Sequence, residues 1–454
     1  MSEEAETVFN TVGASYEAAF GTDEELRKYT ELAAKTLPPR SRVLDVGCGT
    51  GKPVSDILAT AGHEVHGIDI SNEMVTIAGS QVLGNFHVAD MRAYHPLGLF
   101  HAVFAIRSLF QMPACDMCSI VVRFSQWIRV GGYLILGVTP STSLDPHKVT
   151  YDTTWDCAWM LDKIWMGNYV NDLFLSEERW LQLLRESGFV LEMKPVSYLF
   201  SPAGDGHSPE AHYLLMAKKV EREPLIGPYP LSACLKSPHF KCAENLVSED
   251  LGRLLGDIDD NDKVLCVGKE LSRGPFERHA ARFVDCATLL EDLPFAPASF
   301  NTAIAVWQLD YVPDLEQAIQ QLISAVGREN SKVVLVQGAP YNEVIRLLTC
   351  VARSSPVHHQ GHLLHVATRL LAKHGFGNIS VHRIDAGYEF RGESVAQRST
   401  AAAEFLAGIW NKEHPQHDEI QRALVARLQL LFRGDAHTVS NGMVAIVARP
   451  SVSN

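Results

Sequence analysis

The 454-residue sequence lacks an apolar run long enough to cross a membrane, and it lacks an excess of basic residues. A membrane-spanning helix needs about 18 or more consecutive apolar residues, so we expect no membrane association. The formal net charge is −13, whereas binding to a phosphate backbone needs a basic surface. We therefore expect no nucleic-acid partner, and the ordinary composition, 46% hydrophobic and 20% charged, indicates a globular protein.

The first residues, MSEEAETVFN, lack the basic start and apolar run of a secretory signal. The nine cysteines have no regular spacing, so we expect reduced thiols in a cytoplasmic protein. Cys115 and Cys118 have Cys-x-x-Cys spacing and could form a thiol cluster with Cys48 and Cys157. A second Cys-x-x-Cys pair is lacking, so we expect no metal site there.

Strand-like and helix-like segments alternate with short connections from residue 42 to residue 138. The strand-like runs are residues 42–46, 63–70, 86–90, 99–106 and 131–138, and helical patterns occupy 53–62 and 71–82. This alternation predicts an α/β fold with a mostly parallel sheet and helices on both faces. A further amphipathic helix at 176–189 and two final strands, expected to be antiparallel, complete a first domain over residues 1–219.

Residues 220–262 are rich in proline and predict a linker to a second domain over residues 263–454. Four segments of that domain resemble segments of the first domain and occur in the same order. VLCVGKE corresponds to VLDVGCG, TAIAVWQLDYVP to AVFAIRSLFQMP, LLAKHGF to LLRESGF, and GMVAIVAR to HYLLMAKK. Several matches in one order favour a duplication of the fold.

The stretch DVGCGTG places an acid, Asp45, before three glycines at every second position. The glycines are Gly47, Gly49 and Gly51. Such a strand-to-helix turn allows positive φ and lets a ligand lie against bare backbone, although a tight turn without a ligand has the same pattern. Asp69 ends the next strand, where an acid can hold a ribose diol, and Asp90 ends the third, where a carboxylate can accept from an adenine amine.

With these motifs, residues 9–219 resemble the class I S-adenosylmethionine (SAM) dependent methyltransferases, most of all the small-molecule group that includes quinone-biosynthesis enzymes. The resemblance implies a Rossmann-like fold with SAM as cofactor. It places Asp45, Gly47, Gly49, Gly51 and the Arg107 carbonyl around the methionine part, Asp69 on the ribose, Asp90 and Met91 on the adenine, and Ile70 and Met74 beside the adenosine. A dinucleotide dehydrogenase is the alternative, but its phosphates need Gly-x-Gly-x-x-Gly spacing and a loop without acid.

In this family the acceptor pocket is built from the N-terminal helix, the turn after the fourth strand and the segment after the fifth. The candidates for acceptor binding are Tyr16, Phe110, Gln111, Trp155 and Trp159. Trp155 and Trp159 belong to an aromatic stretch, residues 151–169, that predicts either a lid over a planar acceptor or a seam with the second domain. A base is needed only if the nucleophile arrives protonated; the catalytic candidates are Tyr16, His147 and Asp152.

The second copy loses the acid and two glycines, since Cys266, Glu270 and Ser272 replace them, and it is about 21 residues shorter between matching positions. We therefore expect a degenerate domain that binds no SAM and that covers the first domain, shapes the pocket or forms a homodimer. Its histidines 358, 362 and 365 share one helical face, which we expect to be solvated or at an interface, and its helical segment 401–433 is expected to form a seam.

Two functions of different class remain at this stage. The first is a SAM-dependent methyltransferase acting on a small, apolar or aromatic secondary metabolite, since the tandem layout resembles fungal natural-product enzymes. The second is a SAM-fold protein that does not methylate, either a cyclase using SAM as a fixed cation or a scaffold partner. The sequence leaves open whether oxygen, nitrogen, carbon or sulfur would be methylated.

Overall fold

The computed structural model describes residues 2–153, 155–204, 208–220, 226, 235–236, 263–268, 282–284, 293–328, 330–351, 358–410, 415–434 and 436–451. The chain forms two compact units, Met1–Pro224 and Leu225–Asn454. Most of the predicted linker lies outside the described residues. Its residues Leu235–Lys236, however, form strand β12 and pair with the second unit's sheet, so the prediction of a linker is wrong there. Among the described helices, none has the length and apolarity required to span a bilayer.

The first unit is built on a mixed, Rossmann-like sheet with strand order β10-β11-β5-β4-β1-β2-β3, and the short β9 pairs with β11. The strands are β1 (Arg42–Val46), β2 (Glu64–Asp69), β3 (Asn85–Val88), β4 (Phe100–Ile106), β5 (Ile128–Val138), β9 (Phe189–Leu191), β10 (Val196–Phe200) and β11 (Glu210–Lys219). Strands β1 to β5 pair in parallel, whereas β9, β10 and β11 pair antiparallel. The predicted α/β architecture is confirmed for this unit.

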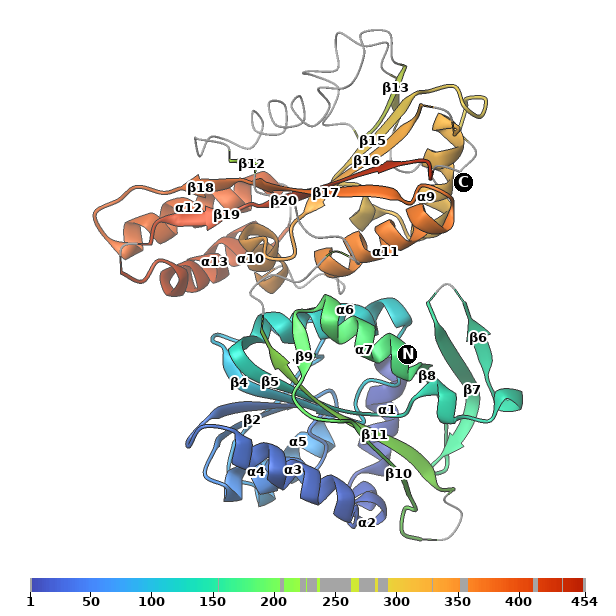
Figure 1. The fold of residues 1–454 in the computed structure, drawn as a ribbon. Helices are drawn as coiled ribbons and strands as arrows, with labels where there is room; N and C mark the ends of the chain where they lie inside the picture. The colour runs from blue at the N-terminus through green and yellow to red at the C-terminus, as the bar shows by residue number, and fades with distance from the viewer. Residues whose placement is uncertain are drawn as a thin grey trace. The chain divides into compact units, whose positions relative to one another are not determined.

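Helices cover both faces of this sheet, with α3 and α4 on one face and α6 and α7 on the other (Figure 1). The helices are α1 (Ser2–Val12), α2 (Ser15–Phe20), α3 (Glu24–Thr36), α4 (Val54–Thr60), α5 (Asn72–Gln81), α6 (Ala114–Trp127) and α7 (Glu177–Glu186). Alternate residues of one strand enter different cores: Val43 packs with α3 and α4, whereas Leu44 packs with α6 and α7. Burial on both faces explains why the central strands are almost continuously apolar.

The segment expected to be an aromatic lid forms a separate three-stranded antiparallel sheet. Its strands are β6 (Thr150–Asp152), β7 (Cys157–Trp165) and β8 (Asn168–Leu175), preceded by the short 3-10 helices η1 (Ser141–Ser143) and η2 (Pro146–Lys148). Leu173 N donates to the Phe110 carbonyl at 2.9 Å, which ties β8 to the loop after β4. At the β7–β8 turn, the Trp165 ring lies 5.7 Å from the Phe9 ring, centroid to centroid, so this turn packs on the N-terminal helices.

The second unit contains a seven-stranded sheet of order β12-β17-β20-β16-β15-β13-β14. Its strands are β13 (Val264–Val267), β14 (Arg282–Val284), β15 (Thr302–Val306), β16 (Lys332–Gly338), β17 (Asn378–Asp385) and β20 (Met443–Arg449). The short strands β18 (Gly387–Glu389) and β19 (Thr438–Ser440) form a separate antiparallel pair. The run β14-β13-β15-β16 is parallel and β20 and β17 follow antiparallel, as in β2-β1-β4-β5-β11-β10. Within the described residues, nothing in this sheet corresponds to β3.

The helices of the second unit correct two expectations. They are η6 (Leu309–Tyr311), α9 (Leu315–Val326), α10 (Glu343–Val351), α11 (Gln360–Lys373), α12 (Val395–Trp410) and α13 (His417–Leu431). The apolar faces of α12 and α13 pack on each other and on α10 through residues such as Leu406 and Leu424, so the prediction of a seam is wrong for these faces. His362 and His365 of α11 are buried rather than solvated.

A buried carboxylate, Asp23, fastens α3 to β10 and β11. Asp23 is 1% exposed and accepts hydrogen bonds from Leu26 N (3.0 Å), the Tyr198 hydroxyl (2.9 Å) and His212 Nδ1 (3.1 Å). Burial alone would raise the pKa of Asp23, but the hydrogen bonds from His212, Leu26 N and Tyr198 outweigh it and lower that pKa. The charged form is thus the one that these contacts stabilise.

We expect Asp23→Ala to lower the free energy of unfolding of the full chain by about 3 kcal/mol at pH 7. The substitution removes a helix N-cap and leaves two buried polar groups without their acceptor. Asp23→Asn keeps the size and the cap, so its loss should be about half as large. Because the folded-state pKa is lowered, the stabilisation is present at neutral pH and is lost as pH falls through that lowered value. Urea unfolding followed by tryptophan fluorescence tests this, and two variants as stable as the parent would contradict it.

Candidate active site

A cavity of about 1150 Å³ opens at the carboxyl ends of the first unit's parallel strands. The predicted residues that line it are Tyr16, Asp45, Gly47, Gly49, Asp69, Ile70, Met74, Asp90, Met91, Arg107, Phe110 and Gln111. The predicted residues absent from its lining are Gly51, His147, Asp152, Trp155 and Trp159. Sites for one small ligand usually measure about 300 to 1000 Å³, so this cavity has room for a cofactor and a second molecule.

The glycine loop after β1 packs closely against the loop after β4 and against α5. Gly47 has φ 69°, and a Cβ added there would lie 2.3 Å from Ser108 Cβ, so no other residue fits without displacing the loop after β4. Gly51 has φ 83° and faces α5, where an added Cβ would lie 3.0 Å from Val82 Cγ2. This glycine thus serves the packing of the loop on α5, and its contact with the cofactor stays a prediction.

Asp45 is 2% exposed and accepts a hydrogen bond from the Ser55 hydroxyl at 2.7 Å. Burial raises the pKa of Asp45 to about 7; the Ser55 hydroxyl opposes that rise, and the negative charge of Asp69 adds to it. A cation bound beside Asp45 would favour its ionised form, since the attraction offsets the cost of desolvation.

Asp69 anchors the loop between β2 and α5. One carboxylate oxygen accepts from Gly49 N and the other from Ser71 N, both at 2.9 Å. Burial raises the pKa of Asp69, and these backbone hydrogen bonds oppose the rise. A carboxylate offers about four acceptor sites, so each oxygen keeps one for a ribose hydroxyl.

Asp90 is held by an arginine that the sequence analysis missed. Arg92 Nε donates to Asp90 at 3.0 and 3.1 Å, Arg92 Nη2 donates to the same carboxylate, and Arg92 Nη1 reaches Asp116 at 3.1 Å. The Asp90 carboxylate was expected to be open to an adenine amine. In the structure, a bound adenine would share this carboxylate with the guanidinium.

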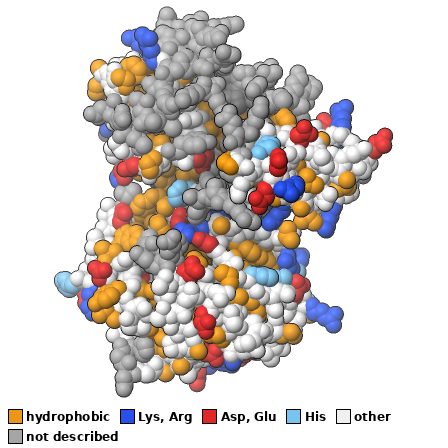
Figure 2. Space-filling model, turned by 180° about the vertical axis from the view of Figure 1, so that it is seen from behind, with side chains coloured by type: hydrophobic (Ala, Val, Ile, Leu, Met, Phe, Trp, Pro, Cys, Tyr) orange, Lys and Arg blue, Asp and Glu red, His pale blue; other side chains and the backbone are white. Residues whose placement is uncertain are grey.

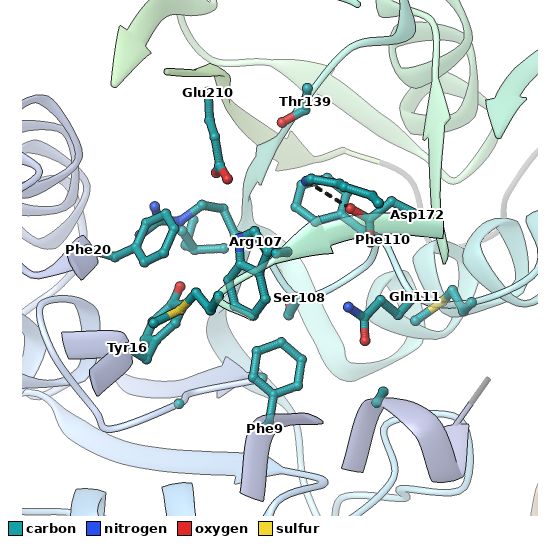
Figure 3. A pocket seen from close by; sticks show the side chains of 18 of the residues that line it. Phe9, Tyr16, Phe20, Arg107, Ser108, Phe110, Gln111, Thr139, Asp172 and Glu210 are labelled. Atoms are coloured by element: carbon teal, nitrogen blue, oxygen red, sulfur yellow. Dashed lines mark hydrogen bonds and ion pairs between the residues drawn. The ribbon is translucent and has the colours of Figure 1, made fainter. Parts of the chain in front are cut away.

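The other end of the cavity is aromatic (Figure 3). Its lining includes Phe9, Phe20 and Glu210, which sequence reasoning did not assign to the site. It also includes Lys163 and Trp165, which lie in the predicted aromatic stretch. Lys163 Nζ pairs with Asp172 at 3.0 Å, and Glu210 at the start of β11 points into the same space. The apolar run of β11 predicts a strand, but it does not say which loop the first residue of that strand faces.

The proposed bases and lid tryptophans lie elsewhere. His147 is exposed on η2, and Asp152 accepts from Trp155 N at 3.2 Å. Neither lines this cavity, and their catalytic role stays a prediction. Trp155 and Trp159 pack against the core between the sheet, α6 and α7. Trp165, at the β7–β8 turn, is the tryptophan that reaches the cavity.

The thiols near the site do not form a reactive cluster. Cys118 and Cys157 are buried in the core of the first unit. Burial raises the pKa of Cys115 and Cys157 to about 12, so both are protonated at neutral pH.

The glycine loop and the strands around it are similar to those of known methyltransferases. Residues 43–132 match the model of a methyltransferase domain. The chain is 32% identical over 125 residues to a 27-O-demethylrifamycin SV methyltransferase of Amycolatopsis mediterranei, covering 25% of this chain and 45% of that one. It is 34% identical over 119 residues to a ubiquinone biosynthesis O-methyltransferase of Xanthomonas campestris, covering 24% and 48%. The chain thus spans less than half the length of these curated relatives.

Over residues 43–132, the first unit is therefore similar to a methyltransferase domain. A solved magnesium protoporphyrin IX methyltransferase from Synechocystis with bound SAM is 19% identical, with a TM-score of 0.32, over 44% of this chain and 80% of that chain. The residues at the acid-rich end of the cavity fit the SAM that the sequence analysis expects. The methyltransferase domain offers a buried acid, Asp45, for an ammonium, a backbone cradle at Gly47 and Gly49, and free acceptor positions on Asp69.

We expect the affinity for S-adenosylhomocysteine (SAH) to fall as pH drops below about 7. Asp45 must lose its proton to pair with the ammonium, and burial raises its pKa to about 7, so affinity should fall by up to about tenfold per pH unit below that value. Calorimetry between about pH 5.5 and 8.5 measures this. Asp45→Asn should bind weakly with a flat profile, whereas Asp56→Asn, away from the cavity, should keep the wild-type profile. A flat wild-type profile would show that Asp45 does not pair with the ligand.

Proposed function

We propose that the chain is a SAM-dependent methyltransferase that acts through its first unit on a small apolar or aromatic acceptor. The observation that carries this proposal is the single cavity that joins the acids after β1 to β3 with the aromatic cluster at Phe9, Tyr16 and Trp165. A cofactor held at the acids would present its methyl group toward the aromatic end.

Methyl transfer mainly requires that the acceptor be aligned with the methyl group and that water be excluded from the site. SAM supplies a methyl group on a sulfonium, and transfer is an in-line displacement that gains from fixed geometry and excluded water. The chain provides alignment through the loops after β1 and β4, which meet at Gly47 and Ser108. It provides dryness through Trp165, whose ring centroid lies 5.9 Å from that of Phe20 and 6.2 Å from that of Tyr16.

The mouth of the cavity supports an apolar acceptor. Leu161, Ile164 and Leu199 line it and are 58%, 69% and 75% exposed, and exposed apolar side chains gathered beside a cavity favour an apolar ligand. The relatives named for rifamycin and ubiquinone methylation support a secondary metabolite or a quinone-like phenol as the acceptor class. On the face drawn in Figure 2, basic side chains are interspersed with acidic ones, which favours a small molecule over a nucleic acid.

We further propose that the second unit is a diverged copy that does not bind SAM. Its strand order and strand directions support the common origin. So do two matching loop features: Trp307 and Arg107 both have φ 56°, and an added Cβ at Gly268 would meet Gln308 as one at Gly47 would meet Ser108. The buried Cys266 stands where the first unit has Asp45, so the ammonium partner is missing from the copy. A homodimer through this unit remains a prediction.

Calorimetry with SAH and the full chain tests the cofactor assignment. We expect one site per chain, and we expect Asp69→Ala to weaken SAH binding by at least about tenfold, since it removes a charged acceptor of two ribose hydroxyls. Glu73→Ala removes an exposed acid of α5. Glu73 does not line the cavity, so this variant should bind SAH as the parent does. Two sites per chain, or tight binding after Asp69→Ala, would overturn the assignment.

The acceptor end is tested with hydroxylated naphthalenes in the presence of saturating SAH. Trp165→Ala should weaken their binding by at least about tenfold, because the substitution removes an aromatic wall and admits water. Trp155→Ala should leave that affinity unchanged and lower only the stability, because Trp155 packs on the core. The proposed location of the acceptor site fails if Trp155→Ala weakens naphthol binding and Trp165→Ala does not.

A further inference from the structure

The aromatic end of the cavity contains a guanidinium that forms no ion pair with any residue that the structure describes. Arg107 leaves the end of β4 and lies over the ring of Phe20, with Cζ 4.8 Å from the ring centroid, and within 6.0 Å of the centroids of Phe200 and Tyr16. The atoms Nε and Nη1 are buried, and no residue in the described part of the chain accepts a hydrogen bond from them. The rings stabilise the positive charge through their faces, but they leave the in-plane N–H groups unsatisfied.

The acids near Arg107 have other hydrogen-bond or ion-pair partners, or they lie too far away to pair with it. Asp172 pairs with Lys163, and Asp23 is bound by Tyr198 and His212. Glu210 faces Arg107 from the start of β11 without an ion pair to it. His212 Nε2 lies 3.7 Å from a Glu210 oxygen and helps to lower the pKa of Glu210, against the effect of burial.

This arrangement is incomplete without a ligand. A buried charged donor with no acceptor costs free energy, and that cost disappears when an anion binds. The planar fork of a guanidinium matches the two oxygens of a carboxylate. The cations Arg107 and Lys163 balance the acids Glu210 and Asp172, so a bound carboxylate would not enter a region of net negative charge.

We propose that Arg107 binds a carboxylate of the acceptor, so the enzyme's substrates are aromatic or apolar acids. This inference rests on the proposed function. With the carboxylate on Arg107, the apolar body of the acceptor lies against Phe9, Phe110 and Trp165 and extends to the apolar mouth. Because Arg107 belongs to the loop that meets the glycine loop, the anchor holds the acceptor next to the methionine end of SAM.

The experiment compares carboxylates with their neutral amides. The probes are 4-hydroxybenzoate and 6-hydroxy-2-naphthoate against 4-hydroxybenzamide and 6-hydroxy-2-naphthamide, titrated calorimetrically into the full chain with saturating SAH. We expect each acid that binds to bind at least about tenfold more tightly than its amide, the effect of a charge-assisted hydrogen bond. Arg107→Met, which keeps the apolar stem over Phe20, should abolish this preference and change SAH affinity by less than about twofold.

Two further variants control for charge and folding. Lys148→Met removes an exposed cation from the cavity rim and should keep the preference. Arg107→Lys keeps the positive charge but lacks the planar guanidinium, so it should retain only part of the preference for the acid over its amide. This variant tests the inference if Arg107→Met does not fold. The inference is overturned if no acid is preferred over its amide, including the case in which neither binds.

The same titrations separate this inference from the proposed function. If Arg107→Met weakens SAH by about tenfold and leaves the acid preference intact, the guanidinium holds the carboxylate of the cofactor and the inference is wrong. If the parent chain binds acids but no SAH, the proposed function fails instead. If SAH binds and the preference is absent, only the inference about the acceptor fails.

Discussion

The site depends on one close approach of backbone, where the loop after β1 passes the loop after β4 at Gly47 and Ser108. Only a glycine allows it, because the residue is left-handed and an added Cβ would overlap Ser108. On the far side of this contact, Arg107 is itself left-handed at φ 56° and donates its N–H to the Gly137 carbonyl at 2.7 Å. These constraints bring Asp45 and Arg107, which are distant in sequence, to the two halves of one cavity.

The two halves have opposite electrostatic character, which orients a ligand pair. At one end, burial raises the pKa of Asp45 and of Asp69, because the charged forms of these acids are poorly solvated there. A sulfonium cofactor with an ammonium relieves this cost, whereas a phosphate-bearing cofactor would increase it. At the other end, rings surround a guanidinium and favour a flat, anionic molecule. Each ligand is therefore disfavoured at the end that the other occupies.

The sequence predicts the cofactor end well and the acceptor end poorly, for a physical reason. Asp69 ends β2 and Asp90 follows β3, and the carboxyl ends of parallel strands meet at one edge whatever the loops do. The choice of tryptophan depends instead on register, and β7 shifts register against β8 between Met160 and Lys163. Alternation counted from Trp159 therefore does not carry through to Trp165. An irregularity of this kind has no short sequence signature, so the density of aromatic residues located the segment but not the residue.

The proposed copy shows which features a fold needs and which only a ligand needs. Gly268 and the left-handed Trp307 persist in the second unit, and the Trp307 N–H donates to the Val336 carbonyl at 2.8 Å, because the strand ends still have to turn in the same way. The acid does not persist, and Cys266 occupies its position with no exposed surface. A buried carboxylate without a cationic ligand destabilises the folded state, whereas a buried thiol behaves as a small apolar group. Once binding is no longer needed, stability alone favours the loss of the acid while the glycine remains.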